Sequence, residues 1–339
     1  VFADPAHAIR VMTHHDVRTH DSLHGLRVQR VGDRGGHPRS DGHGQKRSVD
    51  AVTVRQTEAH VRRAAGRVDL QFRLQAVHQA HDLHASLIDA ARLSGAERLV
   101  VPHGDRAALW AALTRQRTGR CLVLTESLWS MDGDLTPLTE LLDLADAHGA
   151  AVVVDEAHAT GLYGPTGAGW VAHAGLQSRV LATVHTGGKA LGQGGAWIAG
   201  DSLLVDWLIN VSRSFVFSTA VTTAVAAGLQ IAAARARALQ GEVADLLARA
   251  EAFRAHLRSG GCDVRGANSC IVPVVVGSNA RALAVAAALR ADGFDVRAVR
   301  PPTVPDGTAR LRVCVHLEHP SGLLQELATR IMHHLSSIK

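Results

Sequence analysis

Short apolar runs that alternate with helical segments constrain the fold of this chain more than any other feature. Four runs have the length and the aliphatic content of buried strands, namely residues 99–101, 121–124, 150–154 and 180–184. Strands that alternate with helices build parallel sheets, because a parallel neighbour is reached only through a long crossover. We therefore predict an α/β fold whose large domain contains a mainly parallel sheet.

One crossover helix is indicated in detail between the second and third runs. Thr136 suits the N-cap position, Pro137 suits the first turn, and Gly149 suits the end of the helix. One face of this helix carries four apolar residues: Leu138, Leu141, Leu142 and Ala145. The chain from 121 to 154 therefore predicts a strand, a helix and a strand.

The C-terminal part predicts a second, smaller domain. Residues 220–257 are rich in alanine and predict a long helical stretch with a break near Gly241. Three elements of an α+β domain follow: a strand at 271–276, a helix at 280–291 and a strand at 310–315. We assign residues 81–240 to the large domain and residues 241–339 to the small domain.

Residues 1–80 lack the periodicity of a helix or a strand. Their 13 basic and eight acidic side chains carry the whole net charge of +5, so the rest of the chain does not resemble a nucleic-acid binder. We expect this segment to be irregular, and its excess of arginine and histidine is typical of a message read out of frame. His14, His15, His20 and His24 lack the partners that complete a metal site, so no metal is predicted.

The composition argues against two further classes of protein. The four cysteines are scattered without a Cys-x-x-Cys pair, which argues against a disulfide framework or a zinc knuckle. No run approaches the roughly 18 apolar residues of a membrane span, and we see no secretory leader. We expect a soluble, cytoplasmic protein.

The strongest local signal is an acid and a histidine at the end of an apolar strand. Asp155 ends the third run and His158 follows three residues later. Ligands of open α/β sheets bind beyond the carboxyl ends of the strands, where these side chains would project. The same letters spell the DEAH box of helicase ATPases, but that box needs a phosphate loop of the form G-x-x-x-x-G-K-[ST]. Gly188-Lys189 is followed by Ala190, which disfavours the helicase interpretation.

A second signal is a lysine preceded by glycines after the fourth run. Lys189 is one of only three lysines, and the glycines let the backbone approach a ligand closely. A desolvated amine can form a Schiff base, and a carboxylate such as Asp155 can pair with the pyridine nitrogen of pyridoxal phosphate. From the residues alone, a chance arrangement of Asp155, His158 and Lys189 in ordinary loops is an equal alternative.

Five strings of residues carry a resemblance to a known enzyme family. Residues 155–161, 186–192 and 217–220 resemble successive motifs of the α-oxoamine synthases, pyridoxal-phosphate enzymes with the type I aminotransferase fold. Residues 130–134 and 300–312 resemble the branch of this family that acts in biotin synthesis. The resemblance covers residues 81 to 335 in the right order. It implies a homodimer that condenses L-alanine with a pimeloyl thioester and releases carbon dioxide.

The resemblance implies catalytic and substrate-binding roles for individual side chains. Lys189 would hold the cofactor and transfer the α-proton, while Asp155 would pair with the pyridine nitrogen. His84 would stack on the cofactor ring. Arg312, rather than Arg310, would bind the substrate carboxylate through its planar guanidinium.

The resemblance also implies further contacts with the cofactor. His158 and Ser130 would lie near its phenolic oxygen, and Thr186 would bind its phosphate. Ser218 and Thr219 would reach the phosphate held by the partner subunit of the homodimer.

The sequence departs from the family upstream of residue 81. The glycine-rich loop and the Gly-Tyr pair that bind the phosphate in this family are missing there, and the only tyrosine is Tyr163. Thr222 and Thr223 also stand where the family usually has prolines. We therefore expect weak cofactor binding and little activity from this chain. The alternatives are a synthase of the glycine acetyltransferase or 5-aminolevulinate type, and a non-catalytic remnant of the fold.

Overall fold

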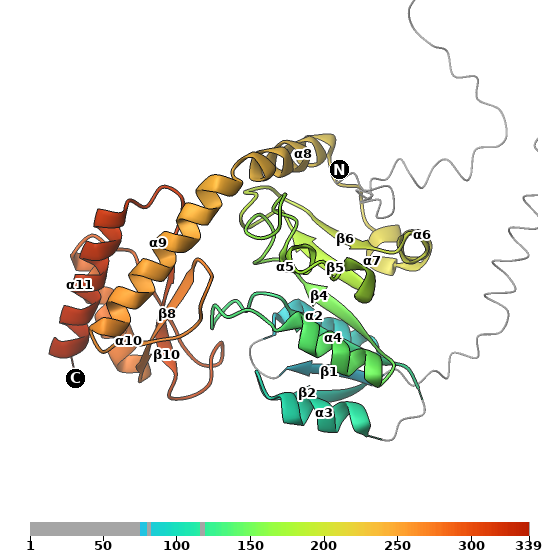
Figure 1. Ribbon diagram of the computed structural model, residues 1–339, viewed down its shortest axis with the longest axis horizontal. Helices are drawn as coiled ribbons and strands as arrows, with labels where there is room; N and C mark the ends of the chain where they lie inside the picture. Colours follow the sequence, from blue (N-terminus) through green and yellow to red (C-terminus); the bar gives the residue numbers. More distant parts are fainter. Residues whose placement is uncertain (1–74, 80–82, 116–118, 339) are drawn as a thin grey trace, which may run out of the picture.

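A computed structural model describes residues 75–79, 83–115 and 119–338 (Figure 1). This part of the chain forms two sheets, each with helices packed on it. The expected mainly parallel sheet and the smaller C-terminal α+β unit are both present. What we expected of residues 1–74, including their irregular structure and their histidines, lies outside the described residues.

The first sheet is parallel except at one edge. Its described strands have the order β2 (Glu97–Val101), β1 (Gln75–Gln79), β3 (Cys121–Glu126), β4 (Ala150–Asp155), β5 (Ala182–Thr186) and β6 (Ala196–Gly200). Only β6 runs antiparallel to its neighbour.

Three features of this sheet correct the expectations from sequence. β1 lies before residue 81 and sits between β2 and β3 inside the sheet. Residues 75–79, which we expected to be irregular, therefore form a strand. β6 was not expected. β5 spans Ala182–Thr186, so it begins and ends two residues later than the predicted strand at 180–184.

Both faces of the first sheet are covered. The crossover helices are α2 (Ala85–Leu93), α3 (Arg106–Thr114), α4 (Leu138–Ala147) and the short α5 (Trp170–His173). Cys121 and Val123 of β3 pack with α3 and α4, whereas the intervening Leu122 and the following Leu124 pack with α2. This alternation follows from the pleat, and burial of both faces explains the continuous apolar runs in the sequence.

Helix α4 begins differently from the prediction. Pro137 occupies the N-cap position without a side-chain cap. Thr136 Oγ1 instead donates a hydrogen bond of 2.5 Å to the carbonyl of Glu126 and accepts one of 2.8 Å from Trp129 Nε1. The predicted N-cap was wrong, because the turn after β3 engages this hydroxyl. The four apolar residues predicted for one face of the helix are all buried.

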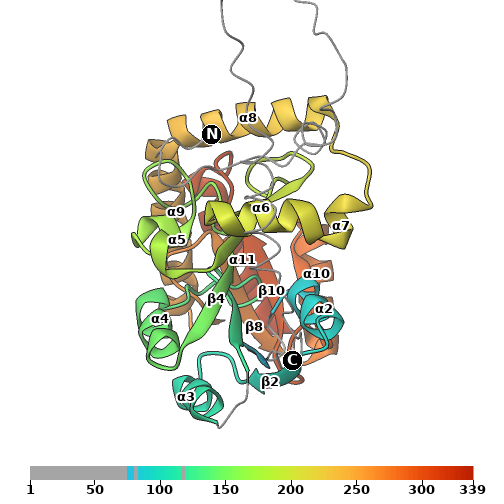
Figure 2. The same cartoon turned by 90° about the vertical axis from the view of Figure 1, so that its right-hand side faces the viewer.

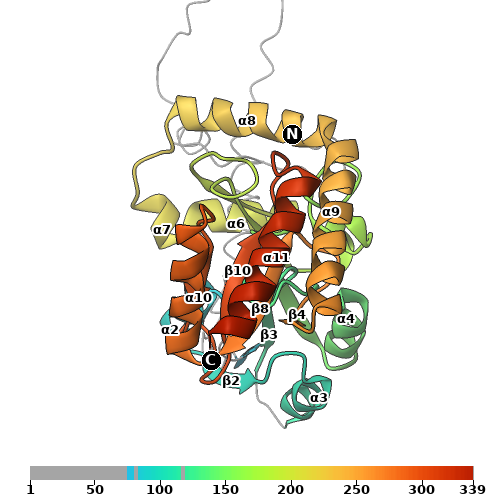
Figure 3. The same ribbon diagram turned by 90° about the vertical axis from the view of Figure 1, so that its left-hand side faces the viewer.

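The second sheet is antiparallel throughout. Its strands have the order β7 (Asp263–Val264), β8 (Ile271–Gly277), β10 (Ala309–Cys314) and β9 (Arg297–Val299). Helices α9 (Gln240–Ser259), α10 (Asn279–Ala291) and α11 (Ser321–Ser337) pack against it and form one apolar core with it (Figure 3). β8, α10 and β10 correspond to the predicted C-terminal elements.

The remaining helices lie before β5 or between β6 and the second sheet. The short turn η1 (Gln177–Arg179) precedes β5, and α6 (Ser202–Val211), α7 (Arg213–Val216) and α8 (Thr223–Ala238) follow β6. The long helical stretch breaks at Leu239, two residues before the predicted break, and α8 lies across the top of the molecule beyond α6 (Figures 1 and 2). Among the helices described, none combines the length and the apolar character needed to cross a membrane.

Candidate functional site

The carboxyl ends of β3, β4 and β5 bring polar residues to one edge of the first sheet. Glu126 and Asp155 are register partners at the ends of β3 and β4, and Thr186 ends β5. Asp155 is 7% exposed, and its Oδ1 accepts a hydrogen bond of 2.8 Å from the backbone N–H of Ala157. The sequence correctly placed Asp155 at the end of a strand, and its part in a ligand site stays a prediction.

Lys189 lies three residues beyond β5, beside this edge. Burial of its amine lowers the pKa below its ordinary value. Electrostatic interactions with the carboxyl groups of Asp155 and Glu126 oppose this effect, and the positive charge of Arg312 adds to it. A lowered pKa increases the fraction of neutral amine at pH 7, which is the nucleophilic form.

His158 lies in the turn after β4 and is neutral at pH 7. Burial lowers the pKa of its imidazole to about 3, and electrostatic interactions with Lys189, Arg312 and His84 act in the same direction. The four side chains are therefore near enough to influence one another electrostatically. A neutral imidazole can donate or accept a hydrogen bond to a bound group without adding charge.

His84 forms the N-cap of α2. Its Nδ1 accepts a hydrogen bond of 3.3 Å from the backbone N–H of Ser86 and lies 2.8 Å from Ser86 Oγ. Its own backbone N–H donates a hydrogen bond of 2.7 Å to Glu126 Oε1. The side chain of His84 is exposed, so its ring is accessible to a ligand.

Arg312 reaches the site from β10 of the second sheet. Its Nε donates a hydrogen bond of 2.7 Å to the carbonyl of Ser130, and its Nη1 lies 3.0 Å from Cys314 Sγ. Arg310, two residues earlier, is fully buried and bonded to Asp132 and to the carbonyl of Met131. The choice of Arg312 over Arg310 as a ligand-binding group is consistent with this difference.

The three predicted phosphate contacts differ in position. Thr186 Oγ1 accepts a hydrogen bond of 3.3 Å from the backbone N–H of Gly188, at the start of the segment that carries Lys189. Ser218 and Thr219 are exposed directly after α7, and Ser218 Oγ donates to the carbonyl of Phe215 at 3.2 Å. Neither Ser218 nor Thr219 takes part in the interactions given above for Lys189, His158, His84 and Arg312.

Two buried residues of this region were missed from sequence. Burial, together with the charge of Asp155, raises the pKa of Glu126 to about 8. Burial lowers the pKa of His185 to about 4, and this ring lies flat against Trp197 of β6 with centroids 5.0 Å apart. Its Nδ1 is 2.8 Å from Thr160 Oγ1 and its Nε2 is 2.8 Å from Thr183 Oγ1. An acid two residues after the second apolar run was the available signal for Glu126.

Glu156 is also buried, but it faces a different element. Its two carboxyl oxygens accept hydrogen bonds of 2.7 and 2.8 Å from the backbone N–H groups of Trp170 and Val171 at the start of α5. Burial raises its pKa to about 7, and these two bonds act in the opposite direction. Glu156 therefore fixes α5 to the turn after β4.

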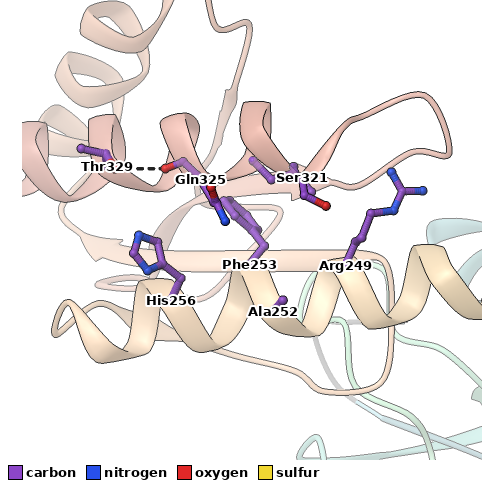
Figure 4. A pocket seen from close by; sticks show the side chains of 8 residues that line it. Arg249, Ala252, Phe253, His256, Ser321, Gln325 and Thr329 are labelled. Carbon is purple, nitrogen blue, oxygen red and sulfur yellow. Dashed lines mark hydrogen bonds between the residues drawn. The ribbon is translucent and has the colours of Figure 1, made fainter.

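A separate pocket lies between α9 and α11. It has a volume of about 530 Å³, and Figure 4 shows Phe253 pointing from α9 toward α11 above His256 and beside Gln325. No predicted site residue lines it. Within residues 75–79, 83–115 and 119–338, no group of three or more His, Cys, Asp or Glu side chains is arranged to hold a metal ion.

Comparisons with known proteins support the resemblance seen in the sequence. Residues 80–331 match the family described as aminotransferase class I and II. The chain is 43% identical over 247 residues to 8-amino-7-oxononanoate synthase of Bordetella petrii, an alignment that covers 72% of this chain and 62% of the relative. It is 48% identical over 253 residues to the enzyme of the same name from Anaeromyxobacter dehalogenans, with 72% and 63% covered. The chain thus spans less than two thirds of the length of these curated relatives.

A solved structure extends the similarity to the fold. Serine palmitoyltransferase of Sphingomonas wittichii has a TM-score of 0.74 and 27% identity to this chain, and the match covers 79% of this chain and 68% of that one. The resemblance and the type I transferase fold predicted from the sequence are confirmed by these similarities.

Proposed function

Because the chain belongs to the aminotransferase class I and II family, we propose that its site is that of a pyridoxal-phosphate-dependent α-oxoamine synthase. The proposed reaction joins L-alanine to a pimeloyl thioester, carried by coenzyme A or a carrier protein. It yields 8-amino-7-oxononanoate, carbon dioxide and the free thiol, a step of biotin biosynthesis. The similarity to the two curated relatives supports this choice of substrates.

The chemistry of the side chains at the strand ends fits pyridoxal phosphate. The cluster of Lys189, Asp155 and His158 is the observation that carries the proposal. It combines an amine of lowered pKa, a nearly buried carboxyl at a strand end and a neutral imidazole. The amine suits the aldehyde of the cofactor, the carboxyl suits its pyridine nitrogen and the imidazole suits its phenolic oxygen. Thr186 is the residue that we propose to bind the phosphate of the cofactor held by its own subunit.

In the proposed reaction, the bound cofactor supplies an electron sink for the carbanion at the α-carbon of alanine. Lys189 Nζ would hold the cofactor and then take the α-proton. Arg312 would orient the alanine by pairing with its carboxylate. His84 would cover the ring face and exclude water, and Ser130 would lie beside the phenolic oxygen with His158.

The proposal includes a homodimer. Leu203 and Trp207 of α6 and Phe217 after α7 are 77%, 59% and 75% exposed, which is unusual for large apolar side chains on neighbouring elements. A second copy of the chain would cover them. Ser218 and Thr219 follow Phe217 directly, so the same contact would bring them toward the partner's phosphate. The cytoplasmic location expected from sequence stays a prediction.

Two measurements test the proposed function. Protein incubated with pyridoxal phosphate and reduced with borohydride should retain the cofactor on the peptide that contains Lys189. Label on another peptide, or on none, would favour a non-catalytic remnant. Product formation from alanine and a pimeloyl thioester should exceed that from glycine with an acetyl or succinyl thioester. Faster turnover of a glycine pair would contradict the substrate but not the family.

A further inference from the structure

Glu126 is a buried carboxyl at the site to which the proposed reaction gives no role. Its side chain is 2% exposed at the end of β3, beside Asp155 in the register of the sheet. Its Oε1 accepts the hydrogen bond of 2.7 Å from the backbone N–H of His84, which lies 42 positions earlier in the chain. A backbone hydrogen bond from Ser130 reaches the same carboxyl. One side chain thus joins two distant segments of the site.

We propose that Glu126 is a positioning residue, which holds the start of α2 against the turn after β3. The two segments carry His84 and Ser130, and Ser130 in turn accepts the hydrogen bond from Arg312. The inference deepens the proposed function, because these are residues to which that function assigns cofactor and substrate contacts.

The surroundings of Glu126 favour its neutral form. Burial is the largest cause of its raised pKa of about 8, and the negative charge of Asp155 acts in the same direction. The hydrogen bonds from His84 and Ser130 and the charge of Lys189 oppose this effect without cancelling it. At pH 7 the carboxyl therefore keeps its proton, and two adjacent negative charges are avoided.

A neutral role makes Glu126→Gln the conservative variant. Glutamine keeps a carbonyl oxygen that can accept from the N–H groups of His84 and Ser130, and it can never ionise. Glu126→Ala removes the acceptor altogether. Glu156→Gln is a matched control, because Glu156 is an equally buried carboxyl of raised pKa that holds α5 instead.

Hydrogen exchange of the backbone amides tests the positioning. In Glu126→Ala, exchange at His84 and Ser130 should be at least about tenfold faster than in the wild type, because each amide loses its acceptor. Glu126→Gln should match the wild type at both amides. The amides of β8 should not change in either variant, which separates a local effect from unfolding. Unchanged exchange at both amides in a folded Glu126→Ala would overturn the positioning role.

The pH dependence of Lys189 acetylation tests the charge state and does not depend on a folded alanine variant. The charged groups that influence the Lys189 amine are Asp155, Glu126 and Arg312, and His158 lies beside them. In the wild type, Glu126 becomes negative above about pH 8 and favours the ammonium form of Lys189. Glutamine cannot do this, so the acetylation midpoint should move to lower pH in Glu126→Gln.

Glu156→Gln should leave the Lys189 midpoint at its wild-type position. An unchanged midpoint in Glu126→Gln, or an equal shift in Glu156→Gln, would overturn the inference. Both measurements use protein without cofactor or substrate and follow single peptides by mass spectrometry. Their failure would leave the proposed function intact, and absent turnover would leave this inference intact.

Discussion

Arg310 donates a hydrogen bond of 2.7 Å from Nη1 to Oδ1 of Asp132, which lies 178 positions earlier in the chain. The bond ties β10 of the second sheet to the loop after β3 of the first. Arg265 pairs with the same oxygen at 3.0 Å. Burial would raise the pKa of Asp132, but the bond from Arg265 and the charge of Arg310 hold it below its ordinary value. Two arginines, Arg310 and Arg312, therefore reach one loop from the same strand with different tasks.

Replacement of Arg310 should destabilise the fold. Arg310→Ala leaves a nearly buried carboxylate with one partner fewer, and breaking a buried ion pair costs about 3–5 kcal/mol. Urea unfolding followed by circular dichroism measures this loss. Arg312→Ala should lower the free energy of unfolding by less than about 1.5 kcal/mol, since it removes hydrogen bonds of an only partly buried group. Equal losses in the two variants would contradict the division of tasks.

Replacement of Arg312 should weaken substrate binding instead. Loss of a charge-assisted hydrogen bond of about 1.5–3 kcal/mol corresponds to at least about a tenfold rise in the KM for alanine. Steady-state kinetics with saturating thioester measures this value. The KM for the thioester should change little. A selective rise in the KM for the thioester would assign Arg312 to the other substrate.

Removal of the Lys189 amine should abolish the chemistry and preserve the fold. Lys189→Ala deletes the group proposed to hold the cofactor, and Lys189 belongs to none of the apolar cores of the described residues. Borohydride should then fix no cofactor on the chain, while the thermal midpoint of unfolding should stay within about 2 °C of the wild type. Lys46→Ala is the control for removal of a lysine and should behave as the wild type. Global unfolding of Lys189→Ala would argue for a structural lysine.

The stability of the protein should depend on pH through His185. Its folded pKa of about 4 lies below the ordinary value of 6.5, so the unfolded chain binds the proton first as the pH falls. The free energy of unfolding therefore keeps its full value above about pH 6.5. It should fall by about 2 kcal/mol or more as the pH decreases toward 4. Urea unfolding at pH 7 and pH 4.5 measures the change. His185→Asn should show a smaller change between these two values, because asparagine does not titrate.

The exposed face of α6 should mediate self-association. Trp207→Glu introduces a charge where a second copy would bury an apolar ring, so sedimentation should show a monomer at micromolar concentration. Trp110→Glu is the matched control, since Trp110 of α3 is exposed to a similar degree, 55% against 59%. A wild-type monomer, or equal dissociation of both variants, would reject this face as the interface.

The elements found from the sequence are those whose apolar runs are covered on both sides. β3 and β4 lie inside the sheet and read as continuous aliphatic runs, and Asp155 was conspicuous as the acid that ends such a run. The helical face of α4 was likewise visible, because its apolar residues recur at the helical period.

The elements that were missed carry weaker local signals. β1 has only two aliphatic residues in five, and its position is fixed by pairing with two strands that come later in the chain. β6 is short, half-exposed and preceded by glycines. Glu126 follows Thr125 rather than the apolar run itself, so the run was ended two residues too early. Thr136 was assigned to a cap because the competing partners, Trp129 Nε1 and the carbonyl of Glu126, become visible only in three dimensions.

The hydrogen bonds around His185 have a single direction. Thr160 Oγ1 donates to the carbonyl of Glu156 at 2.7 Å, so it accepts from His185 Nδ1, which must carry the proton of the neutral ring. Nε2 then accepts from Thr183 Oγ1. To reverse these hydrogen bonds, Thr160 would have to break its bond to the carbonyl of Glu156 while the ring of His185 changes tautomer. These hydrogen bonds therefore connect β5 to the turn that carries His158, and they hold the ring of His185 in one tautomer.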